Sequence, residues 1–119
     1  MAISQAMTTS FKVGILDGIH NFRTGVVRAS TAADTFKIAL YTSSASLDST
    51  TTAYTTSGEV TGTGYTAGGT TLTVSVVPTS SGTTAYLSFS NASWTSATIS
   101  AAGALIYNSS QSNASVAVL

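Results

Sequence analysis

The sequence predicts a mainly β protein, an antiparallel β-sandwich or barrel preceded by one N-terminal amphipathic α-helix. Apolar residues recur at every fourth position near the start of the chain, and after residue 34 they alternate with a period of two. Five or six such short runs are separated by polar turns, and no alternation of strand and helix patterns indicates a parallel sheet. The 119 residues suffice for one core. We divide them into a helix and connector arm, residues 1–34, and a β-sandwich domain, residues 35–119.

The helical pattern covers residues 4–21, SQAMTTSFKVGILDGIHN. Four apolar residues at a spacing of four share one face and are our candidate partner-binding residues: Met7, Phe11, Ile15 and Ile19. Ser4 or Thr8 is the expected N-cap. Each glycine inside the segment costs about 1 kcal/mol of helix stability relative to alanine. Because such a helix is marginal alone, we expect it to dock on its own sheet or on a neighbouring subunit.

The period-two runs begin after a connector at residues 22–34. TFKIALY is expected to be a half-buried strand whose phenylalanine, isoleucine and leucine face the core. A polar loop follows over residues 42–58, in which Leu47 and Tyr54 are the candidate anchors.

The second half of the chain contains the remaining strands. TTLTVSVV is ended by Pro78, which cannot donate a ladder hydrogen bond, and a turn at Ser80–Gly82 leads to TTAYLSFS. Trp94 lies in a short strand or corner and is expected in the core, because a ring of its size buries much apolar area. GALIYNS and SVAVL are two further strands joined by the turn SSQSN. The last strand runs into Leu119 without a polar ending, so we expect it either to continue in a longer product or to be completed by a neighbouring chain.

Charge is scarce and unevenly placed. Charged residues make up 7% of the chain, against about 25% in an ordinary soluble domain. All of them precede Val60, so residues 60–119 have none, while 42 of the 119 residues are serine or threonine. Because a neutral, hydroxyl-rich surface keeps free monomers apart poorly, we expect other subunits to cover much of it. The alternative is a secreted or halotolerant β-domain with a hydroxyl coat.

The totals also bear on partners. A net charge of zero provides no field that attracts nucleic acid or anionic lipid. No apolar run approaches the ~20 residues needed to span a bilayer, and the start MAISQAMTTSF lacks the basic region and apolar core of a signal peptide. The chain has no cysteine, which excludes disulfides and thiolate metal sites. We therefore expect neither nucleic acid nor a membrane as partner.

The segment EVTGTGYTAGGTTL, residues 59–72, contains a match to the G-x-G-x-x-A form of a dinucleotide-binding loop. Such a loop needs a helix after it, whose N-terminus binds the pyrophosphate, and an acidic residue about 20 positions further on. Here a β-branched, period-two run follows, and no acidic residue follows Glu59. We therefore predict no cofactor. We interpret four glycines as structural turn residues: Gly62, Gly64, Gly68 and Gly69.

The sequence contains no recognisable catalytic or metal-binding set. His20 is the only histidine, and a lone histidine at a helix end more often caps carbonyls than binds metal. Asp34, Asp48 and Glu59 are candidate calcium ligands through loop oxygens, but their spacing matches no calcium loop, and the alternative is that they serve turns and solubility. Serine is abundant, yet there is no G-x-S-x-G elbow. We predict that the chain is not an enzyme and holds no metal.

Three blocks resemble a family of tailed-bacteriophage virion structural proteins. EVTGTGYTAGG looks like a motif these proteins share, within the central block TFKIALYTSSASLDSTTTAYTTSGEVTGTGYTAGG. ASWTSATISAAGALIYNSS resembles their C-terminal block and SFKVGILDGIHNF their helical start, so the resemblance covers residues 4–119. The chain departs from the pattern at Ala101 and Ala102, where family members often have a basic residue, and by lacking a further strand or two after VAVL.

The resemblance implies a head decoration, head-fibre or tail-associated protein. Our leading expectation is a capsid decoration, or cement, protein that is assembled in the bacterial cytoplasm and lies on the capsid exterior of the virion. Its expected partners are the major capsid protein and further copies of itself, in a homotrimer. The alternative is a receptor-binding module of a tail or head fibre that recognises a host glycan with Trp94 and the tyrosines.

Overall fold

The protein is mainly β, with antiparallel pairing and one short N-terminal helix, as the sequence predicts. The computed structural model describes residues 2–16, 18–25 and 32–119, so part of the expected connector, residues 26–31, lies outside the described residues. The elements in chain order are β1 (Ala6–Met7), α1 (Thr9–Leu16), β2 (Phe36–Tyr41), β3 (Thr70–Leu72), β4 (Val74–Ser81), β5 (Thr84–Phe89), β6 (Gly103–Asn108) and β7 (Ala114–Val118). Across the described residues the main sheet is open, so the fold is sandwich-like and not a closed barrel.

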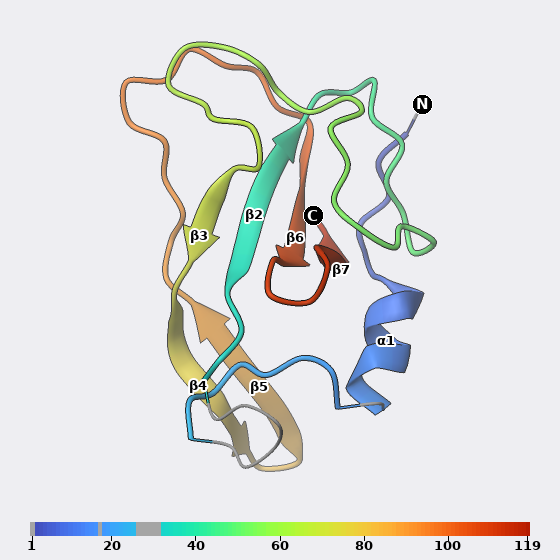
Figure 1. Cartoon of the computed structure of the whole chain (residues 1–119), viewed down its shortest axis with the longest axis vertical. Helices are drawn as coiled ribbons and strands as arrows, with labels where there is room; N and C mark the ends of the chain where they lie inside the picture. The colour runs from blue at the N-terminus through green and yellow to red at the C-terminus, as the bar shows by residue number, and fades with distance from the viewer. Residues whose placement is uncertain (1, 17, 26–31) are drawn as a thin grey trace.

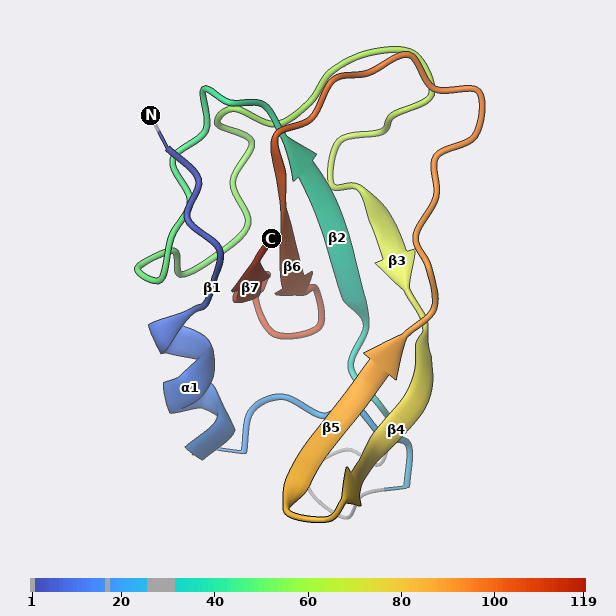
Figure 2. The same ribbon diagram turned by 180° about the vertical axis from the view of Figure 1, so that it is seen from behind.

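A five-stranded antiparallel sheet forms the body of the molecule, in the order β1-β7-β6-β2-β3. Figures 1 and 2 show β2 beside β6 in this sheet, with the hairpin of β4 and β5 below it. β2 pairs with β6 over its whole length, from Phe36 opposite Asn108 to Tyr41 opposite Gly103. β6 pairs with β7 with one register shift after Ile106. GALIYNS and SVAVL are therefore strands, with SSQSN as the turn between them, as predicted.

Both faces of the sheet are covered. The loop at residues 42–58 covers one face through its predicted anchors, Leu47, which is buried, and Tyr54. The core cluster on this face consists of Ala39, Tyr41, Ala45, Leu47, Leu105, Tyr107 and Val118. A second cluster, on the other face, consists of Phe11, Phe36, Leu72 and Val116. The expectation that only one face of β2 is buried is wrong. Ala39 and Tyr41, on the face opposite Phe36, are also buried, because the anchors of the polar loop pack on them.

The helix is shorter than the apolar spacing predicts, since α1 covers only the middle of residues 4–21. Thr8 is its N-cap, because the Thr8 Oγ1 accepts a hydrogen bond from the Phe11 amide at 3.3 Å. The Thr8 amide donates to the Val116 carbonyl at 3.2 Å. The residue that begins the helix therefore also docks it on β7.

Two residues of the predicted helical stripe lie outside α1. Met7 belongs to β1, where it lies opposite Ala117 of β7. Ile19 follows Gly18, whose φ of +69° turns the chain out of the helix while its amide donates to the Ile15 carbonyl at 3.1 Å. Backbone pairing with a sheet edge and a left-handed glycine thus limit the helix at its two ends. The described part of the N-terminal arm contributes one strand to the sheet and the buried ring of Phe11 to its core, while Ile3 and Phe22 pack against the two clusters.

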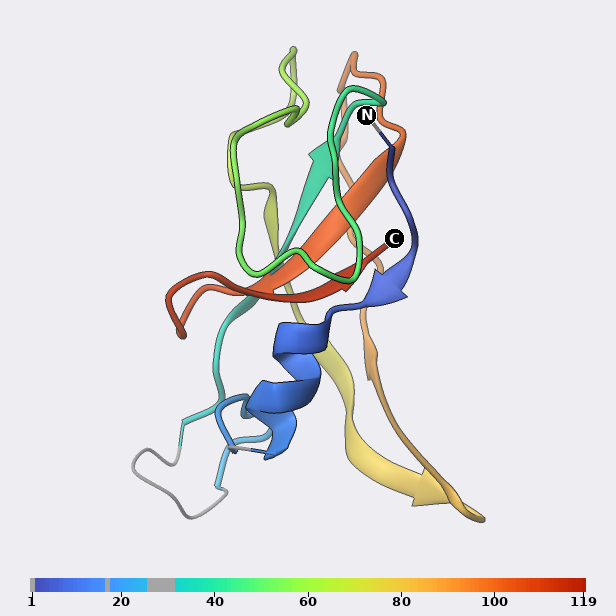
Figure 3. The ribbon, with the colours of Figure 1, turned by 90° about the vertical axis from the view of Figure 1, so that its right-hand side faces the viewer.

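The hairpin of β4 and β5 projects from the main sheet, as Figure 3 shows. Pro78 lies inside β4, so the prediction that it ends the strand is wrong. The register shifts between Val76 and Thr79, and at such an irregularity a proline is tolerated because it need not donate a ladder hydrogen bond. The turn is formed by residues 82–83 and not by Ser80–Gly82. Most hairpin side chains are exposed, because neither strand joins the five-stranded sheet.

Candidate interaction surface

The glycine-rich motif forms a loop on the edge of β2. At its start the Val60 amide donates to the Leu40 carbonyl at 2.9 Å, and at its end β3 pairs with β2. Between these points the chain bends away and runs beside residues 96–99, as the upper part of Figure 1 shows. Residues 60–119, all of which the structure describes, contain no helix. The motif therefore has no helix N-terminus after it that could bind a pyrophosphate.

Three of the motif's glycines, Gly62, Gly64 and Gly69, lie against neighbouring backbone. All four predicted turn glycines adopt positive φ: Gly62, Gly64, Gly68 and Gly69. At Gly64 an added Cβ would lie 2.6 Å from the Cα of Ala97. At Gly69, where φ is +75°, an added Cβ would collide with the carbonyl group of Ile38. Glycine therefore allows this loop to rest directly on β2 and on the segment that precedes β6.

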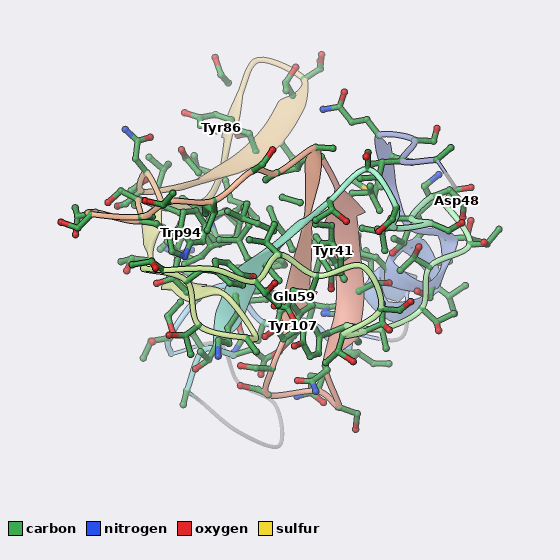
Figure 4. All side chains as sticks on the ribbon, turned by 90° about the horizontal axis from the view of Figure 1, so that it is seen from above. Tyr41, Asp48, Glu59, Tyr86, Trp94 and Tyr107 are labelled. Carbon is green, nitrogen blue, oxygen red and sulfur yellow. The ribbon has the colours of Figure 1, made fainter. Side chains whose placement is uncertain are left out.

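The Glu59 carboxylate holds the glycine-rich loop in place by hydrogen bonds. Its Oε1 accepts hydrogen bonds from the Tyr65 hydroxyl at 2.8 Å and the Gly68 amide at 2.7 Å, and its Oε2 accepts from the Tyr54 hydroxyl at 2.7 Å. We call these four residues the Glu59 cluster. The Tyr107 hydroxyl donates to the Gly68 carbonyl at 2.7 Å, which joins the cluster to β6. Figure 4 shows Glu59 and Tyr107 in the middle of the molecule.

Tyr65 also supplies a hydrogen-bond acceptor to the edge of β2 that β3 leaves unpaired. Its hydroxyl accepts a hydrogen bond from the Leu40 amide at 2.9 Å, beyond the point where β3 stops pairing. Burial raises the pKa of Tyr65 and of Tyr54, and the hydrogen bond to Glu59 and its negative charge raise the pKa of each further. Burial likewise raises the pKa of Tyr41 to about 12. These phenols therefore stay protonated at neutral pH and act as donors inside the fold.

The three acidic residues considered as calcium ligands do not converge. Asp34 accepts a hydrogen bond from the Asn21 amide at 3.0 Å. Asp48 accepts from the Thr50 hydroxyl at 2.6 Å, and this hydrogen bond lowers the pKa of Asp48. Figure 4 shows Asp48 well apart from Glu59. In the described part of the chain, no group of three or more His, Cys, Asp or Glu side chains is placed to hold a metal ion.

The aromatic residues considered for glycan binding do not gather on one exposed platform. Trp94 is half-buried beside Tyr65, with ring centroids 6.0 Å apart, and it lies outside both core clusters, contrary to its predicted place in the core. The Tyr41 hydroxyl donates to the Thr55 carbonyl at 2.7 Å. The hydroxyls of Tyr54, Tyr65 and Tyr107 also donate hydrogen bonds within the protein, so none of these four is free to bind a glycan. Tyr86 is exposed on the hairpin, away from Trp94 in Figure 4.

A groove of about 550 Å³ lies between the helix and the hairpin. One wall is formed by Met7, Phe11, Ile15, His20 and Phe22. The other wall is formed by Pro78, Thr79, Ala85, Tyr86 and Leu87. Figure 2 shows α1 and the hairpin on opposite sides of the lower part of the molecule. The lining contains no Asp, Glu, Lys or Arg, and its apolar and aromatic character is typical of a binding surface.

Three of the four predicted partner-binding residues line this groove. Met7 and Ile15 are 50% and 52% exposed, so both are accessible to a partner. Phe11 is only 6% exposed and belongs to the second core cluster, so it supports the groove from below. Ile19 is exposed but is not among the lining residues, because the chain has left the helix before it.

The hairpin wall is the part of the groove that sequence reasoning missed. The alternation in TTAYLSFS assigns Ala85, Leu87 and Phe89 to one side; Ala85 and Leu87 line the groove and Phe89 packs against the second core cluster. No local pattern indicates that β4 and β5 leave the main sheet, or that Tyr86 lies opposite the helix. The available signal was the absence of charge over residues 74–89, which is unusual for an exposed ribbon.

Comparison of the chain with protein-family models, with curated proteins and with solved structures gave no match. No helix in the described residues is long and apolar enough to cross a membrane.

Gly69→Ala is expected to lower the free energy of unfolding by more than about 3 kcal/mol, because a side chain at positive φ costs about 1–3 kcal/mol and the added Cβ also collides with β2. Gly82→Ala is the matched control, since φ there is +59° and no heavy atom lies within 4 Å of an added Cβ. It should cost only the conformational part, about 1–2 kcal/mol. Urea denaturation measures both values, and equal losses would mean that the loop does not depend on contact with β2.

Tyr65→Phe is expected to lower the free energy of unfolding by about 2–3 kcal/mol, because the Leu40 amide loses its acceptor and Glu59 loses a donor. Tyr86→Phe removes the same atom from an exposed ring and should change the stability by less than about 0.5 kcal/mol. Thermal and urea unfolding of the two variants provide the comparison. If Tyr65→Phe were as stable as Tyr86→Phe, the Glu59 cluster would not have the structural role described here.

Proposed function

We propose that the protein is a structural component of a tailed-bacteriophage virion, a capsid decoration protein that binds the outer shell of the head and stabilises it. The observation that carries the proposal is the apolar groove between α1 and the hairpin, on a chain without any charged residue after Glu59. The resemblance of three sequence blocks to virion structural proteins supports it.

The exposed apolar side chains that line the groove provide the affinity in this proposal. Met7 is 50% exposed and Ile15 is 52% exposed, both on the wall that the N-terminal arm forms. Burying such side chains against a partner gains about 25 cal/mol for each Å² of apolar surface removed from water. Within the described residues β4 and β5 pair only with each other, so the hairpin also offers strand edges to which a partner strand can add.

The proposed mechanism is stabilisation by mass action. A protein that binds the assembled shell more tightly than separate capsid subunits shifts the equilibrium towards the shell, by about 2.7 kcal/mol per site at a concentration 100 times Kd. The proposed partners are the major capsid protein and, in a homotrimer, further copies of this chain, on the capsid exterior. The scarcity of charge implies that binding depends little on salt.

The copy number in purified virions tests the proposed function. A decoration protein should be present in a number comparable with that of the major capsid protein and should rebind to emptied heads. Quantitative gel electrophoresis of purified particles measures the first property, and sedimentation with emptied heads measures the second. A faint, tail-associated band together with binding to host cells would contradict the proposal and favour the receptor-binding alternative.

The two walls of the groove can be tested together. Ile15→Ser combined with Tyr86→Ser is expected to weaken binding to emptied heads at least about tenfold, a loss of about 1.4 kcal/mol. The matched control is Val13→Ser combined with Val76→Ser, which changes exposed residues of the same helix and hairpin that do not line the groove. Phe11→Ser is unsuitable, because emptying a buried aromatic position costs about 3–5 kcal/mol of stability. Equal weakening by both double variants would show that the groove is not the contact.

A further inference from the structure

His20 links the wall of the groove to a fully buried amide. Its Nδ1 lies 3.0 Å from the Nδ2 of Asn108, whose side chain has no exposed surface. The His20 ring packs against Phe11, with ring centroids 4.7 Å apart, and it lines the groove. One side chain therefore contacts both an internal polar group and the surface that faces a partner.

The orientation of the Asn108 amide is fixed by two further hydrogen bonds. Its Oδ1 accepts from the Ser110 amide at 3.1 Å, and its Nδ2 donates to Asp34 Oδ2 at 2.8 Å. The reversed amide would place two oxygens together at Asp34 and two N–H groups together at Ser110. The nitrogen therefore faces His20, and because an amide nitrogen only donates, His20 Nδ1 must accept. The form that fits is a neutral imidazole with its proton on Nε2.

A protonated imidazole does not fit this arrangement. Both of its ring nitrogens donate, so no rotation of the His20 ring offers Asn108 an acceptor. The amide cannot reverse without losing its bonds to Ser110 and Asp34. Protonation therefore breaks the contact between His20 and Asn108.

We infer that His20 is a pH-sensitive switch of the groove. The neutral side chain holds the apolar form of the wall, and protonation on acidification releases His20 from Asn108 and changes the wall that it forms with Phe11 and Phe22. An apolar partner is bound in preference by the neutral form. The switch is a property of the free chain and does not rest on the proposed function.

Among the described residues, one carboxylate is joined to this contact. Asp34 shares the Asn108 amide with His20 and also accepts from Gln111 Nε2 at 3.3 Å. In the described part of the chain, the other titratable side chains on the elements around His20 are Lys12 of α1, Arg23, Lys37 and Tyr41 of β2, Tyr86 of β5 and Tyr107 of β6; Tyr41 and Tyr107 belong to the core cluster on the other face of the sheet. Lys12 and Arg23 are exposed, and Lys37 lies on the face of β2 opposite Phe36, whose ring centroid is 6.5 Å from that of His20.

NMR titration of the isotope-labelled full chain, without a partner, tests the inference. At about pH 7.5 the imidazole ¹⁵N signals should show a proton on Nε2 and none on Nδ1. On acidification Nδ1 should take up a proton, and the Asn108 side-chain amide and the methyl groups of Met7 and Ile15 should shift with the same midpoint. A proton on Nδ1 at the higher pH, or groove signals that do not follow the midpoint, would overturn the inference.

His20→Asn is the matched variant, because the introduced amide oxygen stands two bonds from Cβ, as His20 Nδ1 does, and accepts from the Asn108 amide at every pH in the range. In this variant the Met7 and Ile15 methyl signals should no longer show the transition. If the transition persists with the same midpoint, the switch does not reside in His20. If the variant fails to fold, the ring tautomer and the coupled shifts of the unaltered chain decide the question by themselves.

Discussion

The carboxylate of Glu59 is the interaction on which the arrangement of the loops depends. It binds the Tyr54 hydroxyl from the loop that covers one face of the sheet, and the Tyr65 hydroxyl and Gly68 amide from the glycine-rich loop. The Gly68 carbonyl accepts in turn from Tyr107 of β6. Hydrogen bonds to a charged acceptor are roughly twice as strong as those between neutral groups. Glu59, the last charged residue of the sequence, therefore fixes two loops against the sheet.

Hydroxyl groups carry much of the remaining internal polarity. Thr8 and Ser115 are fully buried, and the Ser115 hydroxyl donates to the Thr51 carbonyl at 2.7 Å and lies 3.1 Å from the Ser10 hydroxyl. These contacts join the start of α1 to β7 and to the loop at residues 42–58. In the described residues every buried side-chain polar atom has a hydrogen-bond partner. The abundance of serine and threonine thus has an internal use, besides the uncharged surface that the composition indicates.

Local pattern was sufficient where neighbouring residues decide the structure. Period-two alternation between clear turns predicted β2, β6 and β7, and Thr8 was correctly considered as an N-cap. Distant contacts decided the rest. Met7 continues the apolar spacing of the helix but pairs with β7, more than 100 residues away, and the covering of the second face of β2 depends on where Leu47 of a polar loop folds back. The sequence likewise indicated the helical wall of the groove but not the hairpin wall. Pro78 was expected to end a strand, whereas β4 continues past it through a register shift.

An aromatic group behind the groove joins its two walls. Phe22 stacks on Phe36 with centroids 4.1 Å apart, and Phe89 of β5 lies 6.0 Å from Phe36 and 6.2 Å from Phe22. Because an isolated two-stranded ribbon is marginally stable in water, this contact matters for the position of the hairpin. Phe11 brings α1 to the same group, with its ring 6.2 Å from Phe22 and 4.7 Å from His20. A change in the position of the His20 ring therefore acts on the contacts that set the helix and the hairpin relative to each other, so the shape of the groove and its charge change together.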